Sequence, residues 1–362
     1  MIEFTGLQVF HNWVNIYYIG GRNMKPRDYI ISQIEHRETR PVPYTFPYEP
    51  EIAQKLNEYY GSNDWTKAIK VYMQSYLWVD TIQEVDISDT HAKDVFGSIW
   101  RTDRRPWHLE QPVLGEASLK NYKFPSVSQF TDQIYHAKEE AINKIKNDPD
   151  HFHVINMGWG IFEQTWRMRG FENALMDAIT EPEFYKELLY RITELYVEMV
   201  KACADVPADA FLFGDDWGDQ RGVIIGPARW RELIKPCWKQ VYDIVHKQGK
   251  YVMSHSCGSI VDIMDDVIEI GLDVYESVQP EAAGMNPYTI KKKWGNRITF
   301  WGCLGSQSII PFGTPDEIRN EIRKLCNEMG KGGGFIISPA KPLQPETPVE
   351  NAAVILETFN DQ

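Results

Sequence analysis

Short apolar segments alternate with amphipathic helical patterns over most of this chain, and no other feature of the sequence constrains the fold as strongly. The apolar segments are rich in Val, Ile and Phe, as in strands that are buried on both faces. Strictly alternating strands and helices indicate a parallel sheet covered by helices. The predicted strands are residues 42–46, 153–157, 210–214, 250–254, 274–278, 298–302 and 334–338.

The number of predicted strands is close to eight, so we predict an α/β fold of the (β/α)8 TIM-barrel type. Residues 24–362 would form a single barrel domain. Residues 62–135 are the least periodic part of it and are rich in Trp, Asp and Pro. We expect long loops and a hairpin there, as an insertion that faces the substrate. Residues 1–23 carry many aromatic side chains and are predicted to be an N-terminal extension of the barrel.

Charge and cysteine content exclude several classes of protein. The net charge is −13, which argues against binding to nucleic acid or to an anionic membrane. No apolar run is long enough to span a bilayer. The five cysteines are too few for a disulfide framework in a chain of this length, so we expect a reducing cytoplasm.

Side chains that bind soft metals follow the strand at 250–254. Residues two apart in a strand point to the same side, so His255 and Cys257 are expected to converge just beyond it. An imidazole and a thiolate suit zinc, and Cys303 or Glu276 could supply the third ligand of an open catalytic site. The spacing also permits two plainer interpretations, a metal-free hydrogen-bonding His255 and a buried packing cysteine at 303.

Polar and aromatic groups at other strand ends could act beside such a metal. Asp215 and Asp216 end the strand at 210–214 and are candidate catalytic acids or bases. They could also support the metal ligands from outside or anchor the substrate, and a helix cap or a loop ion pair is the plainer alternative. Trp159, Glu163 and Trp166 could line a pocket for a flat ligand, although packing within the barrel loops would explain them too. Trp217 follows the aspartate pair and is a fourth candidate for substrate binding.

The chain resembles the uroporphyrinogen decarboxylase superfamily from Met24 onward. Two of the matches are Gly214-Asp215-Asp216-Trp217-Gly218 and His255-Ser256-Cys257-Gly258, and the others are segments 162–172, 313–315, 333–339 and 345–351. The resemblance implies the barrel fold and one of two chemistries. One is cofactor-free decarboxylation of uroporphyrinogen, and the other is zinc-dependent methyl transfer to or from the cobalt of a corrinoid protein.

The methyltransferase branch is the closer of the two. True decarboxylases carry an Arg-Gln-Ala-Gly-Arg motif after the first strand, whereas segment 46–51 here contains no arginine. Thiol-methylating members bind zinc through a His-x-Cys pair and a cysteine in the last-strand motif, where this chain has Ser338 and an earlier Cys303. The resemblance therefore implies zinc, a corrinoid carried by a partner protein, and a small methyl donor or acceptor such as a methoxyarene (O-demethylation) or a thiol. A cofactor-free decarboxylase or lyase and a non-catalytic tetrapyrrole- or corrinoid-binding protein are the alternatives, and the sequence allows an oligomer.

Overall fold

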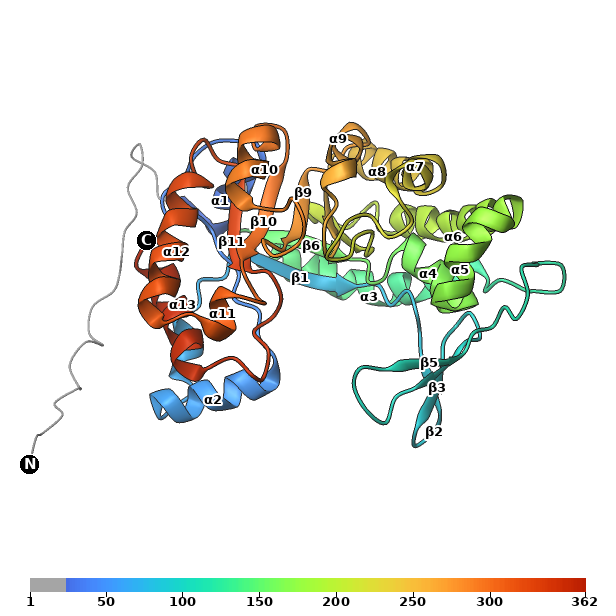
Figure 1. Ribbon diagram of the computed structural model, residues 1–362, viewed down its shortest axis with the longest axis horizontal. Helices are drawn as coiled ribbons and strands as arrows, with labels where there is room; N and C mark the ends of the chain where they lie inside the picture. The colour runs from blue at the N-terminus through green and yellow to red at the C-terminus, as the bar shows by residue number, and fades with distance from the viewer. Residues whose placement is uncertain (1–23) are drawn as a thin grey trace, which may run out of the picture.

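A computed structural model describes residues 24–362, so the prediction for residues 1–23 lies outside the described residues. Seven parallel strands form one curled sheet in the order β1-β6-β7-β8-β9-β10-β11 (Figure 1). The strands are β1 (Met73–Trp78), β6 (Phe152–Asn156), β7 (Ala210–Gly214), β8 (Tyr251–His255), β9 (Val274–Val278), β10 (Thr299–Leu304) and β11 (Phe335–Pro339). With its flanking helices, this sheet confirms the predicted (β/α)8 barrel-like fold.

The segment 42–46 lies beside β11 but forms only one ladder bridge, between Tyr44 and Ile337. The expected first strand is thus reduced to a single parallel contact. Its sequence explains why, because Pro43 and Pro47 have no N–H group to give to a ladder. The Tyr44 hydroxyl accepts a 2.8 Å hydrogen bond from the backbone N–H of Lys70, which leads into β1. The segment thereby links the two ends of the curled sheet.

Helices cover the outside of the sheet, and capping residues and prolines mark where several of them begin. Thr314 and Glu317 form a capping box at the start of α12, in which each side chain caps the other residue's backbone. A π-helical turn, Trp230–Ile234, separates α7 from α8, and Pro236 lies in the first turn of α8. The helices are α1 (Pro26–Ile34), α2 (Pro50–Tyr60), α3 (Val127–Lys146), α4 (Ile161–Arg169), α5 (Phe171–Thr180), α6 (Pro182–Ala202), α7 (Pro227–Arg229), α8 (Lys235–Lys247), α9 (Met264–Glu269), α10 (Pro287–Trp294), α11 (Ile309–Phe312), α12 (Pro315–Glu328) and α13 (Val349–Asn360).

The insertion after β1 is a small antiparallel sheet, where long loops and one hairpin were expected. Its strands, in the order β2-β3-β4-β5, are β2 (Val85–Ser88), β3 (His91–Lys93), β4 (Ile99–Arg101) and β5 (His108–Gln111). Strands of three or four residues are too short to show a clear alternation in sequence, and every residue of β2 is exposed. The sheet projects away from the barrel beneath α4 and α5 (Figure 1).

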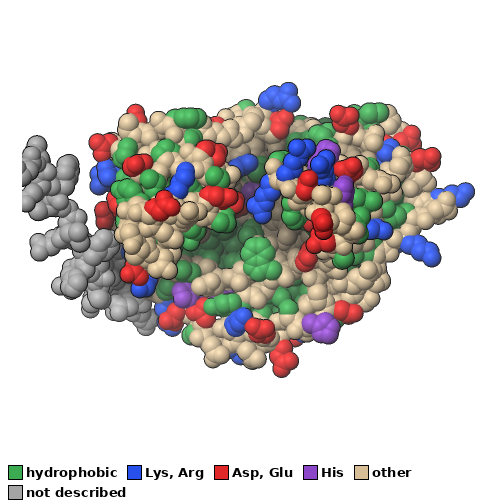
Figure 2. Space-filling view, turned by 90° about the horizontal axis from the view of Figure 1, so that it is seen from below, with side chains coloured by type: hydrophobic (Ala, Val, Ile, Leu, Met, Phe, Trp, Pro, Cys, Tyr) green, Lys and Arg blue, Asp and Glu red, His purple; other side chains and the backbone are tan. Residues whose placement is uncertain are grey.

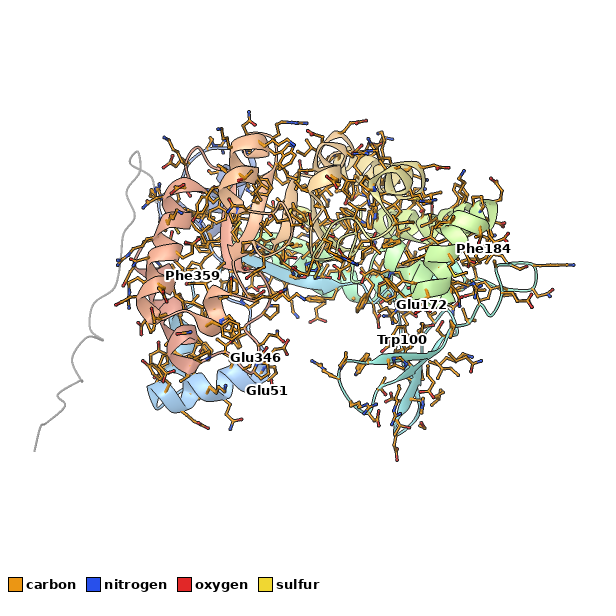
Figure 3. The ribbon with its side chains drawn as sticks, in the orientation of Figure 1. Glu51, Trp100, Glu172, Phe184, Glu346 and Phe359 are labelled. Carbon is orange, nitrogen blue, oxygen red and sulfur yellow. The ribbon has the colours of Figure 1, made fainter. Side chains whose placement is uncertain are left out.

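The carboxyl ends of the parallel strands open onto one face of the molecule. Helix α11 follows β10, the antiparallel insert follows β1, and α2 follows the segment 42–46 beside β11, so all three stand around this face. Figure 2, which looks at that face, shows a central hollow lined largely by hydrophobic side chains, with charged side chains around its rim. Glu51 and Glu346 lie on one side of it and Trp100 of the insert on the other (Figure 3). No helix in the described range 24–362 has the length and apolar character needed to cross a membrane.

Candidate metal centre

Three potential metal ligands converge at the ends of β7 and β8. His255 is the last residue of β8, and its Nε2 atom lies 3.3 Å from Cys257 Sγ and 3.4 Å from Asp216 Oδ1. Ligand atoms of the three residues all lie within 4.8 Å of one another, and this is the one such cluster within residues 24–362. Nitrogen, sulfur and oxygen donors at this spacing suit zinc. The structure therefore brings the predicted His-x-Cys pair together and adds Asp216 to it.

Asp216 reaches the cluster because of the strand register. Gly214 of β7 pairs with His255 of β8, so the residues that follow the two strands emerge side by side. The backbone N–H of Cys257 then donates a 2.7 Å hydrogen bond to Asp216 Oδ1. Sequence reasoning had made Asp216 a candidate acid or base and not a metal ligand. The position of Asp216 directly after Asp215 could have indicated the different role, because neighbouring residues of an extended chain point their side chains to opposite sides.

Glu276 stands behind the histidine and not among the three converging donors. It pairs with His255 in the register of β8 and β9, and its Oε2 atom lies 2.5 Å from His255 Nδ1. A carboxylate on one ring nitrogen fixes the tautomer and directs the other nitrogen toward a metal. Glu276 is thus placed as an orienting partner of His255, whereas the sequence had suggested a competing ligand.

The electrostatics of the cluster favour a positive charge at its centre. Burial opposes protonation of His255, but the neighbouring Glu276, Asp216 and Cys257 outweigh it and raise the pKa of the imidazole well above its usual value. Burial would raise the pKa of Asp216, but hydrogen bonds from His255 and Cys257 lower it overall. An arrangement of acceptors that holds a proton between them also favours a bound metal cation.

Asp215 has a different environment from its neighbour, because it is fully buried. Its Oδ2 atom accepts 2.7 Å hydrogen bonds from the indole N–H groups of Trp217 and Trp238. The backbone N–H groups of Phe162 and Glu163, in the first turn of α4, also donate to this carboxylate, at 3.2 and 2.9 Å. Burial raises the pKa of Asp215 to about 6 despite these bonds. The carboxylate therefore anchors the start of α4 to the end of β7.

The loop before α4 fits closely against this anchor. A Cβ atom at position 160 would lie 2.2 Å from the carbonyl oxygen of Gly214 and 2.3 Å from the Cβ atom of Asp215. Only glycine allows such an approach, so Gly160 fixes the distance between the β6–α4 loop and Asp215. Trp159 is the residue directly before this close contact.

The four predicted substrate contacts differ in exposure. Trp159 is 42% exposed, whereas Glu163 and Trp217 are buried. Trp217 packs against Trp230 and Trp238 with ring centroids 5.4 and 6.2 Å apart, so it belongs to the wall of the barrel and not to an open pocket. Trp166 is half-buried, with its ring edge-on to Phe171. Burial raises the pKa of Glu163 well above its usual value, with Asp216 and Asp215 adding to the effect.

Cys303 is absent from the converging donors of the described residues, in contrast to its predicted role as a ligand. The pairing of β10 with β9 shifts register between Trp301 and Gly302, which marks a bulge. Gly302 and Cys303 have φ angles of 122° and 74° there, so the alternation of side chains along the strand is broken. The Cys303 thiol is buried and interacts electrostatically with Lys291 of α10 and Glu321 of α12, on the helical side of the sheet.

Comparison with known proteins agrees with this architecture. A sequence profile of the uroporphyrinogen decarboxylase (URO-D) family matches residues 101–362. A uroporphyrinogen decarboxylase from Thermus thermophilus is 22% identical over 188 residues, which cover 50% of this chain and 50% of that protein. The chain thus spans about half the length of this curated relative. The Geotalea daltonii decarboxylase is 21% identical over 298 residues, covering 76% of this chain and 82% of its own.

A solved structure shares the fold over a longer stretch. A methyltransferase from Methanosarcina mazei superposes with a TM-score of 0.67 and covers 93% of this chain and 99% of its own. The sequence identity is 16%, so this likeness concerns the fold. Because the family profile matches well over half of the chain, the protein belongs to the uroporphyrinogen decarboxylase (URO-D) family.

Proposed function

We propose that this protein is a zinc-dependent methyltransferase that moves a methyl group between a small substrate and the cobalt of a corrinoid protein. The observation that carries the proposal is the convergence of His255, Cys257 and Asp216 at the mouth of the barrel, with Glu276 behind the histidine. The substrate is a methoxyarene or a thiol, and both present a heteroatom that a metal can bind.

The donor set fits a catalytic metal site. Three protein ligands leave a fourth position open for substrate, which is the arrangement of catalytic zinc. The side chains of His255 and Asp216 are 33% and 35% exposed, so the site can be reached from the mouth. A bound zinc ion would supply Lewis-acid chemistry, polarising the heteroatom that carries or accepts the methyl group.

The residues around the donors have separate roles in this scheme. Glu276 holds the His255 ring in the orientation that directs Nε2 at the site. Asp215 keeps the first turn of α4 in place and acts as a positioning residue, since it is itself inaccessible. Glu163 lies beside both aspartates, and burial together with their charges raises its pKa, so its carboxyl favours the protonated form more than a free glutamate does.

The mouth argues against uroporphyrinogen as substrate. A porphyrinogen with eight carboxylates needs several free cations. In the insert Arg101 pairs with Asp103 at 2.9 Å, and Arg105, which precedes β5, lies 3.8 Å from Glu49, which precedes α2. These cations already face carboxylates. A cofactor-free decarboxylase using Asp215 is also disfavoured, because that side chain is fully buried.

A methyl-transfer assay tests the proposal. Purified protein is loaded with zinc and given methylcobalamin with a thiol, or cob(I)alamin with a methoxyarene. Asp216→Ala should lower the rate at least about 100-fold, because it removes a metal ligand. Asp219→Ala is the matched control: Asp219 lies in the same loop, and its side chain accepts hydrogen bonds from Arg221 and Gly222. Full activity after removal of all metal would refute the proposal, as would metal-independent decarboxylation of uroporphyrinogen.

A further inference from the structure

Helix α4 connects the candidate metal centre with the antiparallel insert. Its first turn donates the N–H groups of Phe162 and Glu163 to Asp215. At its other end, the carbonyl of Arg167 accepts a 2.9 Å hydrogen bond from the Ser98 hydroxyl, and that of Met168 accepts one from the Leu114 N–H. These contacts satisfy carbonyls that a helix end would leave free. The insert is therefore fixed to the same helix that Asp215 anchors.

The Arg167 guanidinium lies between two tryptophan rings. Its Cζ atom is 4.0 Å from the ring centroid of Trp100 in the insert and 4.9 Å from that of Trp159. Nη2 donates a 2.9 Å hydrogen bond to Glu84, which leads into β2. The whole residue is only 3% exposed, and its Nε atom is buried without a hydrogen-bond partner. The two ring faces and Glu84 thus compensate a buried cation.

Trp100 is itself held firmly. Its indole N–H donates a 2.9 Å hydrogen bond to Asp94 Oδ2, and the other oxygen of Asp94 accepts from the backbone N–H groups of Gly97 and Ser98. The stack of Trp100, Arg167 and Trp159 therefore has one fixed end in the insert. Its other end is Trp159, in the β6–α4 loop.

Trp159 has the Arg167 cation against one ring face, and part of its remaining surface is open. It is 42% exposed and directly precedes Gly160, which packs against Asp215. A cation on one face of an aromatic ring draws on the negative charge of its π system. The other face is then less attractive to a second cation and better suited to an electron-rich ring, for which stacking is favourable.

We infer that Arg167 is a positioning residue, which holds Trp159 as a stacking platform for a flat, electron-rich aromatic part of the substrate. The inference rests on the proposed methyl transfer and selects methoxyarenes over thiols as its substrate class. The insert, through Trp100 and Glu84, then takes part in substrate choice without contacting the substrate.

Binding without turnover tests the platform. The affinities of zinc-loaded protein for 1,2-dimethoxybenzene and for 1,2-dimethoxycyclohexane are measured by calorimetry. The two ligands carry the same ether groups on a flat and on a puckered ring. We expect the aromatic ligand to bind about 5- to 10-fold more tightly, and this preference to vanish in Trp159→Ala. Equal affinities in the wild-type protein, or an unchanged preference in Trp159→Ala, would overturn the inference.

The role of Arg167 has its own variant and control. Arg167→Lys keeps the charge but loses the planar group that stacks between two rings. It should reduce the aromatic preference several-fold and raise KM for a methoxyarene while leaving kcat nearly unchanged. Arg169→Lys is the control, because Arg169 lies on the same helix and pairs with Asp177 away from both rings. An undiminished preference in folded Arg167→Lys contradicts the positioning role; if this variant does not fold, Trp159→Ala still decides.

The outcomes separate this inference from the proposed function. An aromatic preference that depends on Trp159, in a protein that transfers no methyl group, would leave the platform standing and remove the methyltransferase assignment. Methyl transfer to thiols with no aromatic preference would support the methyltransferase assignment and remove the platform.

Discussion

Cys257 and Cys303 both lie near the ends of apolar strands of the same sheet, yet their thiols have opposite surroundings. Cys257 follows β8 without any break in alternation and lies partly exposed beside His255 and Asp216. Cys303 lies in β10 at a bulge and is 2% exposed, on the side of α10 and α12. The difference shows that a cysteine at a strand end of a barrel is not sufficient evidence for a ligand. The local register decides which way its side chain points.

Thiol labelling should show the largest difference between the two cysteines. In metal-free protein at pH 8, Cys257 should react with iodoacetamide roughly a thousandfold faster than Cys303, because Cys303 becomes accessible only by local unfolding. Burial also raises the pKa of the Cys303 thiol well above its usual value, which leaves little thiolate. Peptide mapping of the labelled protein measures both rates. Cys203 and Cys326, whose pKa values burial raises to about 12, serve as buried references. Comparable rates at 257 and 303 would contradict the assignment of the two environments.

Removing Glu276, the partner of His255, should have a smaller effect, and this effect should be on zinc binding at the site that contains Cys257. Glu276→Ala should weaken zinc binding about 10- to 100-fold, since the imidazole loses the carboxylate that orients it. Glu281→Ala is the matched control, because Glu281 bonds to Gln307 and Ser308 and not to the cluster. A competition assay with a chelating dye measures both affinities. Equal affinities in the two variants would remove Glu276 from the site.

The smallest expected effect concerns Lys291, which interacts with Cys303, and it is a pH dependence of the free energy of unfolding. Burial lowers the pKa of Lys291 to about 8, from its ordinary value of 10.5. Between these values the unfolded chain binds more protons than the folded one, so the contribution of Lys291 to the free energy of unfolding rises with pH. We expect a gain of about 1–2 kcal/mol from pH 8 to pH 10.5, reduced by solvent screening of this partly exposed group.

Urea titrations of the wild-type protein and of Lys291→Met at several pH values measure this gain. The variant should lack this rise and should be the more stable of the two near pH 7, where the wild-type protein carries a partly buried charge. Parallel pH profiles for the two proteins would show that Lys291 is not desolvated.

Much of the fold could be predicted because its signals are local and strong. The strands at 210–214 and 274–278 have the predicted bounds, since each is a clear apolar run. The antiparallel insert was missed because its strands are stabilised by pairing with one another and not by an apolar pattern. The first strand was overestimated, because the prolines that limit its pairing were outweighed by its apolar residues.

The site was predictable only in part, for a geometric reason. Alternation along a regular strand correctly brought His255 and Cys257 together, but the roles of Asp216 and Glu276 depend on which strands are neighbours and in what register. The bulge at Gly302 is a property of the backbone that leaves no mark in the sequence beyond the glycine itself. The stack on Arg167 depends on Trp100, which lies in the insert and far from Arg167 in the chain, so no spacing could reveal it.

The central claim is that the metal centre belongs to β7 and β8 and does not include Cys303. Its most direct test is the zinc content of the purified wild-type protein, Cys257→Ala and Cys303→Ala, measured by mass spectrometry with folding checked by circular dichroism. We predict about one zinc ion per chain in the wild-type protein and in Cys303→Ala, and a large loss in Cys257→Ala. Full zinc occupancy in Cys257→Ala, or loss of zinc from a folded Cys303→Ala, would contradict the account.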